Sequence, residues 1–300
     1  MFNPSNSNQQ AGLSIISVLC LCVAFQAYAQ VLPEAELGIK IPLANKPVSR
    51  PMSIAYAPTS HRYYVADGGL TAMMSENGMS LSPSPIEIYD DKGAFINSCK
   101  PGLDNRSIYF NEAKQELETV TYNISSAAGF FPNTGIFSLD VDEKGDLKGS
   151  TNEISGHNPA FGDPSTIPTY DPVSHHYFAK QGRSNKVWVV DLAQREKVGE
   201  IALDLTSAGV AFDDLADYHI AYTGVTGEEL AILDVDHKSV LVFDINGKFI
   251  SKSALPGNLK LHAQNHISGL GYTNGMFFVY NEPEGEFGTF CGFKIFEQPN

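Results

Sequence analysis

The chain has 300 residues, 43% of them hydrophobic and 18% charged, which is a globular composition and enough for one large all-β domain or two smaller domains. Acidic residues outnumber basic ones by 34 to 20, and the net charge is −14. A uniformly negative surface repels phosphate backbones and anionic lipids, so the charge argues against nucleic-acid and membrane-surface binding. It is compatible with a cationic partner or a divalent cation.

The first 29 residues differ from the rest of the chain. Residues 13–25 form an apolar run of 13, too short for an ordinary membrane span, and small residues at Ala27 and Ala29 make a cleavage site before Gln30. We therefore predict a signal peptide over residues 1–29, with an uncleaved anchor as the alternative. Residues 30–300 are expected to form a single soluble domain, secreted or periplasmic, with no membrane insertion of the mature chain.

Two cysteines, Cys99 and Cys291, remain after that cleavage. An exported protein can hold a disulfide. Sequence spacing does not decide whether these two pair, so one bridge and two separate thiols both stay open.

In chain order, a lone alternating strand at residues 37–43 precedes the first of several four-strand patterns. The clearest pattern spans residues 219–250, where short apolar runs rich in Val, Ile and Phe are separated by turns. Its last turn contains Asn246 and Gly247, which both tolerate positive φ. One such unit cannot bury both of its faces alone, so it needs copies beside it.

Five copies are visible, and their first strands begin near residues 53, 107, 165, 219 and 267. A repeat of this size with four strands predicts an all-β fold of the β-propeller type with five visible blades. The fifth copy stops after its third strand, so we expect the N-terminal strand at 37–43 to complete that blade and close the ring. Six blades are the alternative, if residues 209–212 belong to a separate, degenerate unit.

An alternating strand, a D-x-x-G turn and an outer strand recur as IYDDKGAFI and VFDINGKFI. Over most of residues 37–296 this pattern resembles the NHL and YVTN-type propeller repeats of exported proteins. The resemblance implies the propeller fold but no single activity, because those families include scaffolds, lactonases and lyases.

Compact catalytic signatures are missing from the sequence, including the G-x-S-x-G, H-E-x-x-H and Walker patterns. Residues 140–151 resemble a calcium loop at first. Lys144 occupies its fifth position and Thr151 its twelfth, where oxygen ligands are required. A strand that ends in a tight turn is the better interpretation.

A propeller can build a site where the connection from each outer strand to the next inner strand reaches the central channel. The polar candidates in these connections are Arg50, Arg106, His157, Asn158, Asp214, His262 and His266. His157, His262 and His266 could ligate a divalent metal, Ca or Zn, or act as bases. Ordinary solvated loop residues are the alternative for each of them.

The same face is expected to receive two long loops, residues 67–85 and 123–134. They carry Met73 and Met74, and Phe130 and Phe131, respectively. Long loops in a compact domain are usually functional or mobile. Exposed Met and Phe suit a hydrophobic or carbohydrate ligand or a partner protein, whereas a lid packed on its own blade is the alternative.

These observations favour an exported β-propeller that binds a small molecule, a carbohydrate or a protein through this face without catalysis. The alternative is a metal-assisted hydrolase or lyase of the lactonase-like propeller type, with Arg106 holding an anionic substrate. Whether the protein is an enzyme stays open at this point.

Overall fold

The computed structural model describes residues 30–47, 50–68, 71–75, 78–82, 85–102, 105–122, 134–283 and 287–297. This part of the chain is built from β-strands, apart from the short helix α1 (Leu205–Ala208) and the 3₁₀ turns η1 (Pro159–Phe161), η2 (Phe212–Asp214) and η3 (Ala263–His266). None of the described helices is long or apolar enough to cross a membrane.

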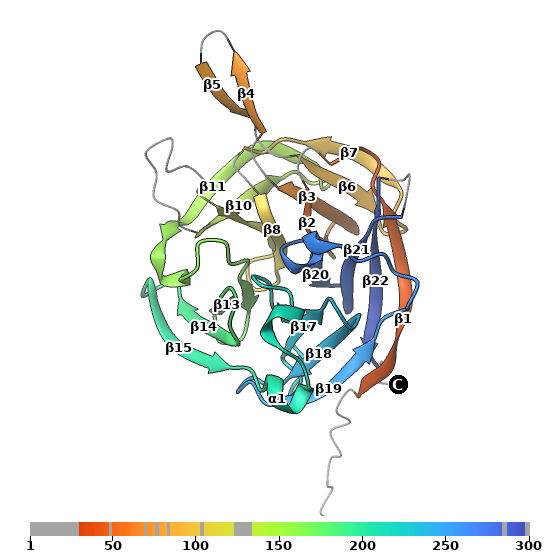
Figure 1. The fold of residues 1–300 in the computed structure, drawn as a ribbon. Helices are drawn as coiled ribbons and strands as arrows, with labels where there is room; N and C mark the ends of the chain where they lie inside the picture. The colour runs from red at the N-terminus through yellow and green to blue at the C-terminus, as the bar shows by residue number, and fades with distance from the viewer. Residues whose placement is uncertain are drawn as a thin grey trace, which may run out of the picture.

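The strands form antiparallel groups that follow one another around a ring, which is the arrangement of a propeller-type fold (Figure 1). The groups are β2 (Arg50–Ala57), β3 (Arg62–Gly68), β6 (Ile86–Asp90) and β7 (Phe95–Cys99); β8 (Asn105–Asn111), β9 (Glu116–Tyr122), β10 (Thr134–Val141) and β11 (Leu147–Asn158); β12 (Thr169–Asp171), β13 (His176–Lys180), β14 (Lys186–Asp191) and β15 (Glu196–Ala202); β16 (Ala221–Tyr222), β17 (Leu230–Asp234), β18 (Ser239–Phe243) and β19 (Phe249–Ala254); and β20 (Leu270–Thr273), β21 (Met276–Asn281) and β22 (Thr289–Phe296).

The N-terminal strand β1 (Val31–Pro42) completes the last group, as the sequence predicted. It pairs antiparallel with β22, from Val31 opposite Phe296 to Pro42 opposite Thr289. The strand begins earlier than expected, at Val31 rather than Leu37. β1 also makes a single parallel bridge to β19, and β2 makes another to β20, so three groups join into a 12-stranded sheet that ends at β7 and β16.

Burial along the strands explains their sequence patterns. The middle strands β17 and β18 are buried at every position because neighbouring groups cover both of their faces. Their sequences are therefore almost continuously apolar. The outer strand β19 alternates between exposed and partly buried residues over most of its length, because one of its faces meets solvent.

The D-x-x-G turns of the repeat share one geometry. In the turn before β19, Asp244 Oδ1 accepts hydrogen bonds from the backbone N–H groups of Asn246 and Lys248, both at 2.9 Å. Gly247 then adopts a φ of +85°, and a Cβ there would lie 2.5 Å from the carbonyl oxygen of Ala202 in the neighbouring group. Glycine is therefore required both by the turn and by contact with the next group.

The segment that resembled a calcium loop is the same turn in the second group. Asp142 Oδ1 accepts from the N–H groups of Lys144, at 2.8 Å, and Asp146, at 2.9 Å. Asp146 in turn forms an ion pair with Arg62 of the first group. The carboxylates are thus used by the turn and by the contact between groups.

Two segments differ from the sequence expectation. Residues 209–212 form no strand: Gly209 ends α1 in a left-handed conformation, and η2 begins at Phe212. The long connection 67–85 contains a hairpin, β4 (Thr71–Ser75) and β5 (Gly78–Ser82), which projects from the rim of the ring (Figure 1). Met73 and Met74 lie on β4, whereas Phe130 and Phe131 fall outside the described residues.

A pair of glycine substitutions tests the contact between groups. Both Gly247 and Gly209 have positive φ, but no atom lies within 4 Å of a Cβ placed at Gly209. We expect Gly209→Ala to lower the free energy of unfolding by about 1 kcal/mol through backbone strain, and Gly247→Ala by about 2 kcal/mol more because the adjoining strand must also shift. Urea denaturation of both variants measures the difference, and equal losses would contradict the contact.

Candidate ligand-binding site

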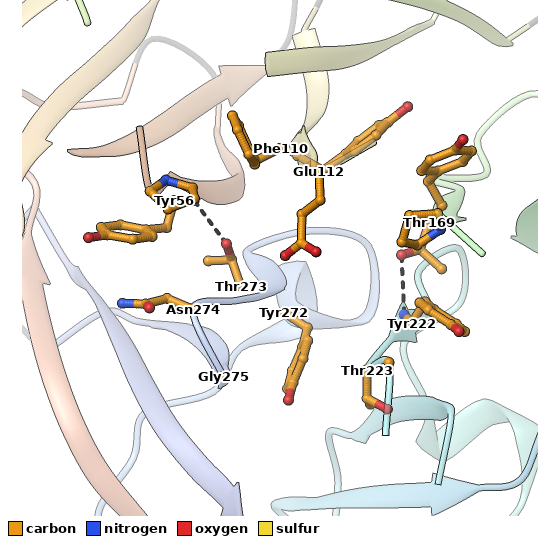
Figure 2. Close-up of a pocket in the computed structure, with 15 residues that line it drawn as sticks. Tyr56, Phe110, Glu112, Thr169, Tyr222, Thr223, Tyr272, Thr273, Asn274 and Gly275 are labelled. Atoms are coloured by element: carbon orange, nitrogen blue, oxygen red, sulfur yellow. Dashed lines mark hydrogen bonds between the residues drawn. The ribbon is translucent and has the colours of Figure 1, made fainter. Parts of the chain in front are cut away.

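A pocket of about 520 Å³ lies where the C-terminal ends of the first strands of the groups meet. Each of the five groups contributes an aromatic residue from the last or next-to-last position of its first strand, and all five residues are half-buried. These residues, shown with the rest of the lining in Figure 2, are Tyr56, Phe110, Tyr170, Tyr222 and Tyr272.

Two threonine side chains accept hydrogen bonds from strand ends in the neighbouring group around this pocket. The backbone N–H of Tyr56 donates to Thr273 Oγ1 at 2.9 Å, and that of Tyr222 donates to Thr169 Oγ1 at 3.1 Å (Figure 2). Each hydroxyl belongs to the neighbouring group and satisfies an N–H that would otherwise lack a partner where the strand ends. The aromatic residues are therefore held by the junctions between groups.

The pocket walls are backed by a second layer of rings. Tyr222 stacks on Phe178 with ring centroids 5.7 Å apart and an interplanar angle of 13°, and Tyr56 packs on Tyr63 at 4.7 Å. Aromatic pairs of this kind fix ring orientation. The wall is thus largely formed before any ligand arrives, which lowers the entropic cost of binding.

Two rim phenols are also held by histidines at equivalent turn positions. Tyr56 Oη lies 3.2 Å from His61 Nδ1, and Tyr170 Oη lies 2.8 Å from His175 Nδ1. Both histidines have positive φ, +52° and +60°, which is uncommon for a residue with a side chain. The turns of the first and third groups therefore position their rings by the same device.

A buried carboxylate lies behind the pocket wall. Glu118 is fully buried and accepts hydrogen bonds from Tyr109 Oη, from Asn111 Nδ2 at 3.1 Å and from Lys114 Nζ at 2.8 Å. Loss of solvent, followed by the neighbouring Tyr177 and the Glu118 charge, raises the pKa of Tyr109 well above its usual range. Tyr109 lines the pocket and stays a neutral phenol that donates to Glu118.

Among the described residues that line the pocket, Glu112 is the one with a charged side chain. It lies in the turn after β8, and its carboxylate points into the middle of the cavity (Figure 2). Within the described part of the chain, this carboxylate forms no hydrogen bond or ion pair with another residue. The arrangement can place a negative charge against a ligand held between aromatic rings.

The residues singled out from the sequence lie near the opposite end of the inner strands. Arg50 begins β2 and Arg106 is the second residue of β8, while Asn158 ends β11 and Asp214 lies in η2. His262 is the cap residue of η3, and His266 is its last residue. The pocket is therefore at the other mouth of the channel from the one that the sequence favoured.

The structure brings two of those connections together. His266 Nδ1 donates to the carbonyl oxygen of Leu215 at 3.0 Å, and its Nε2 lies 3.3 Å from Asp236 Oδ1. Asp214, next to Leu215, uses Oδ2 to accept from the N–H of Ala211 at 2.7 Å. Both ring nitrogens of His266 are occupied by protein contacts, so this side chain is not poised to ligate a metal.

The remaining candidates are not assembled into a centre by the described residues. His262 is exposed, with Nε2 3.4 Å from the carbonyl oxygen of Glu282, and Asn158 Oδ1 caps η1 by accepting from Ala160 N–H at 2.9 Å. In the part of the chain that the structure describes, no group of three or more His, Cys, Asp or Glu is arranged to hold a metal ion. The side chains of Arg50 and His157, like those of Met73 and Met74, lie outside that part.

The two cysteines are separate thiols. Cys99 is half-buried on β7, and Cys291 is buried on β22. Burial raises the pKa of the Cys291 thiol. The sequence left open one disulfide or two separate thiols, and in the structure the two cysteines are not bonded to each other.

Two buried bases near this opposite end had no signal in the sequence. Lys180 Nζ donates to the carbonyl oxygens of Gln181 at 2.8 Å and Ser184 at 2.6 Å, and burial lowers its pKa to about 8. His219 is buried with no hydrogen-bond partner for Nδ1 among the described residues, and burial lowers its pKa to about 4. The alternation of apolar residues along a strand does not show that a lysine or histidine at or near its end is buried.

The neutral state of His219 predicts a pH dependence of stability. The unfolded chain takes up a proton on this residue near its ordinary pKa of about 6.5, whereas the folded chain does so only near pH 4. Stability should therefore fall as the pH drops through this window, by about 2 kcal/mol between pH 7 and pH 5 from this residue alone. Urea unfolding at both pH values should show that loss in the wild type but not in His219→Asn; equal pH dependence in both proteins would refute the assignment.

No protein-family model matches the chain, and no curated protein matches it. Among solved structures, the glutaminyl cyclase of Myxococcus xanthus aligns with a TM-score of 0.50 and 9% identity, over 89% of this chain and 99% of that chain. Raptor of Chaetomium thermophilum aligns with a TM-score of 0.36 and 11% identity, over 82% of this chain and 20% of that chain. The first likeness supports an all-β, propeller-type fold; the resemblance to NHL and YVTN-type repeats is not confirmed beyond that fold type.

Proposed function

We propose that this protein is an exported propeller-type binding protein that holds a small organic ligand in the pocket at the C-terminal ends of its inner strands. The observation that carries the proposal is the convergence of one aromatic side chain from each of five groups on a single cavity. We further propose that these five groups, with β1 as the outer strand of the last one, are the complete set of blades.

The cavity has the size and lining of a small-molecule site. Its volume of about 520 Å³ falls within the range of about 300–1,000 Å³ typical of such sites. Half-buried tyrosine rings offer apolar faces for stacking and hydroxyl groups for hydrogen bonds. A neutral ring, a sugar or an amine could use those faces, whereas the Glu112 carboxylate disfavours an anion.

Export is part of the same proposal. β1 begins at Val31, one residue after Gln30. Cleavage after Ala29 would therefore leave the whole of the β1 strand available to pair with β22. A secreted or periplasmic location follows from the apolar run and the cleavage site, which lie outside the described residues.

The enzyme alternative has weaker support. A metal-assisted hydrolase or lyase would need a ligand set, and the described residues offer none with suitable geometry. The likeness to a glutaminyl cyclase is a likeness of fold at 9% identity, and a fold does not fix an activity. Binding by the aromatic pocket is the function that the described geometry supports best.

A pocket-filling substitution tests the proposal. Pro172 lines the pocket, whereas its neighbour Val173 is 84% exposed and is not part of the lining. A panel of amines, sugars and organic acids should contain compounds that raise the melting temperature of the wild type in a saturable manner.

We expect that stabilisation to disappear in Pro172→Trp, because the indole occupies the cavity, and to persist in Val173→Trp. Differential scanning fluorimetry gives the shifts, and circular dichroism checks that both variants are folded. A panel without any stabilising compound, or stabilisation that survives in Pro172→Trp, would be evidence against a ligand site in this pocket.

A further inference from the structure

We propose that the ligand of this pocket is an organic cation, whose ammonium centre is held between the aromatic rings and the carboxylate of Glu112. This inference rests on the proposed function and names its ligand class.

The first support is the charge of the lining. Glu112 is exposed to the cavity, is directed into it and is unpaired among the described residues, while the rest of the lining is uncharged (Figure 2). A neutral ligand that filled the cavity would strip water from this carboxylate without giving it a partner, which is unfavourable. A cation removes that penalty by pairing with it.

Carboxylates behind the wall add to the same field. Asp171 is buried and hydrogen-bonded to the phenol of Tyr222, and Glu118 is buried behind Tyr109. Lys114 Nζ lies 2.8 Å from Glu118 Oε1 and compensates part of that charge. The immediate surroundings of the pocket thus keep an excess of negative charge.

The phenols respond to this field. The pKa of Tyr222 is raised, first by burial and then by its hydrogen bond to Asp171 and by the Asp171 and Glu229 charges. The pKa of Tyr170 is raised by burial and by the Glu118 charge. Carboxylates that disfavour a phenolate at this place favour a positive charge there for the same electrostatic reason.

The rings supply the second half of the recognition. The face of a neutral tyrosine or phenylalanine carries the negative part of its quadrupole, which attracts an ammonium group within about 6 Å of the ring centre. Five half-buried rings around one cavity offer several such faces. The net charge of −14 would also draw a cation toward the protein at long range.

Isothermal titration calorimetry with choline and with its uncharged analogue 3,3-dimethylbutan-1-ol tests the inference on the intact mature chain. The two probes share their shape and differ by nitrogen against carbon at the branching centre. We expect choline to bind at least about tenfold more tightly, and its affinity to fall as salt is raised.

Glu112→Gln should remove most of that preference. The matched control is Glu116→Gln, which deletes the same charge from the exposed first residue of β9 but not from the pocket lining, and it should leave choline affinity within about twofold. Pro172→Trp should abolish binding of both probes.

The outcomes separate the two proposals. If the uncharged analogue binds as tightly as choline and Pro172→Trp abolishes both, the pocket stands and the cation inference falls. If Glu116→Gln weakens choline binding as much as Glu112→Gln does, overall charge rather than the pocket carboxylate is responsible, and the inference again falls. If neither probe binds although other panel compounds bind in the pocket, only the cation inference is overturned; if nothing binds there, both proposals fail.

Discussion

The pairing of β1 with β22 is the constraint on which the remaining architecture depends. It joins the start of the described chain to its end within one four-stranded group. Without it, β22 would present an unpaired edge, and the groups on either side would lose a fixed neighbour. Because the groups are held in sequence around the ring, the ends of their inner strands keep fixed positions, and a pocket can form between them.

Because the groups repeat in sequence, residues at equivalent places in each group lie around that pocket. An aromatic residue stands at the last or next-to-last position of the inner strand in all five groups, and the residue two places after it also lines the cavity: Pro58, Glu112, Pro172, Gly224 and Asn274. Packing accounts for the shared aromatic position, because the ring contacts another ring in four of the five groups. Such packing does not explain why only one of the five equivalent positions two residues later carries a carboxylate. Glu112 is therefore the residue at which the second group differs from the other four.

Strand periodicity was enough to predict the groups, the turns and the role of the N-terminal strand, because these depend on local alternation and on residues such as Gly247 that permit positive φ. The polar residues that the sequence singled out lie at the opposite end of the inner strands from the pocket that we propose as the site. Two of these polar side chains serve the backbone: Asn158 caps η1, and His266 bonds the Leu215 carbonyl. Irregular connections leave backbone groups without partners, and polar residues gather there to satisfy them, so their presence alone does not indicate a site.

Among the described residues, the hydrogen bonds that join neighbouring groups differ between the two ends of the inner strands. At the N-terminal ends of two neighbouring pairs of groups, backbone bonds link the groups directly: Ile167 N–H donates to the Tyr218 carbonyl at 2.8 Å, and Gly269 N–H to the Met52 carbonyl at 2.8 Å. At the C-terminal ends of the same pairs of inner strands, the hydrogen bonds run through the side chains of Thr169 and Thr273 instead.

A side chain inserted between two backbones holds them further apart than a direct backbone bond does. Thr169 and Thr273 also line the pocket, so the side chains that join the groups at these two junctions form part of its wall.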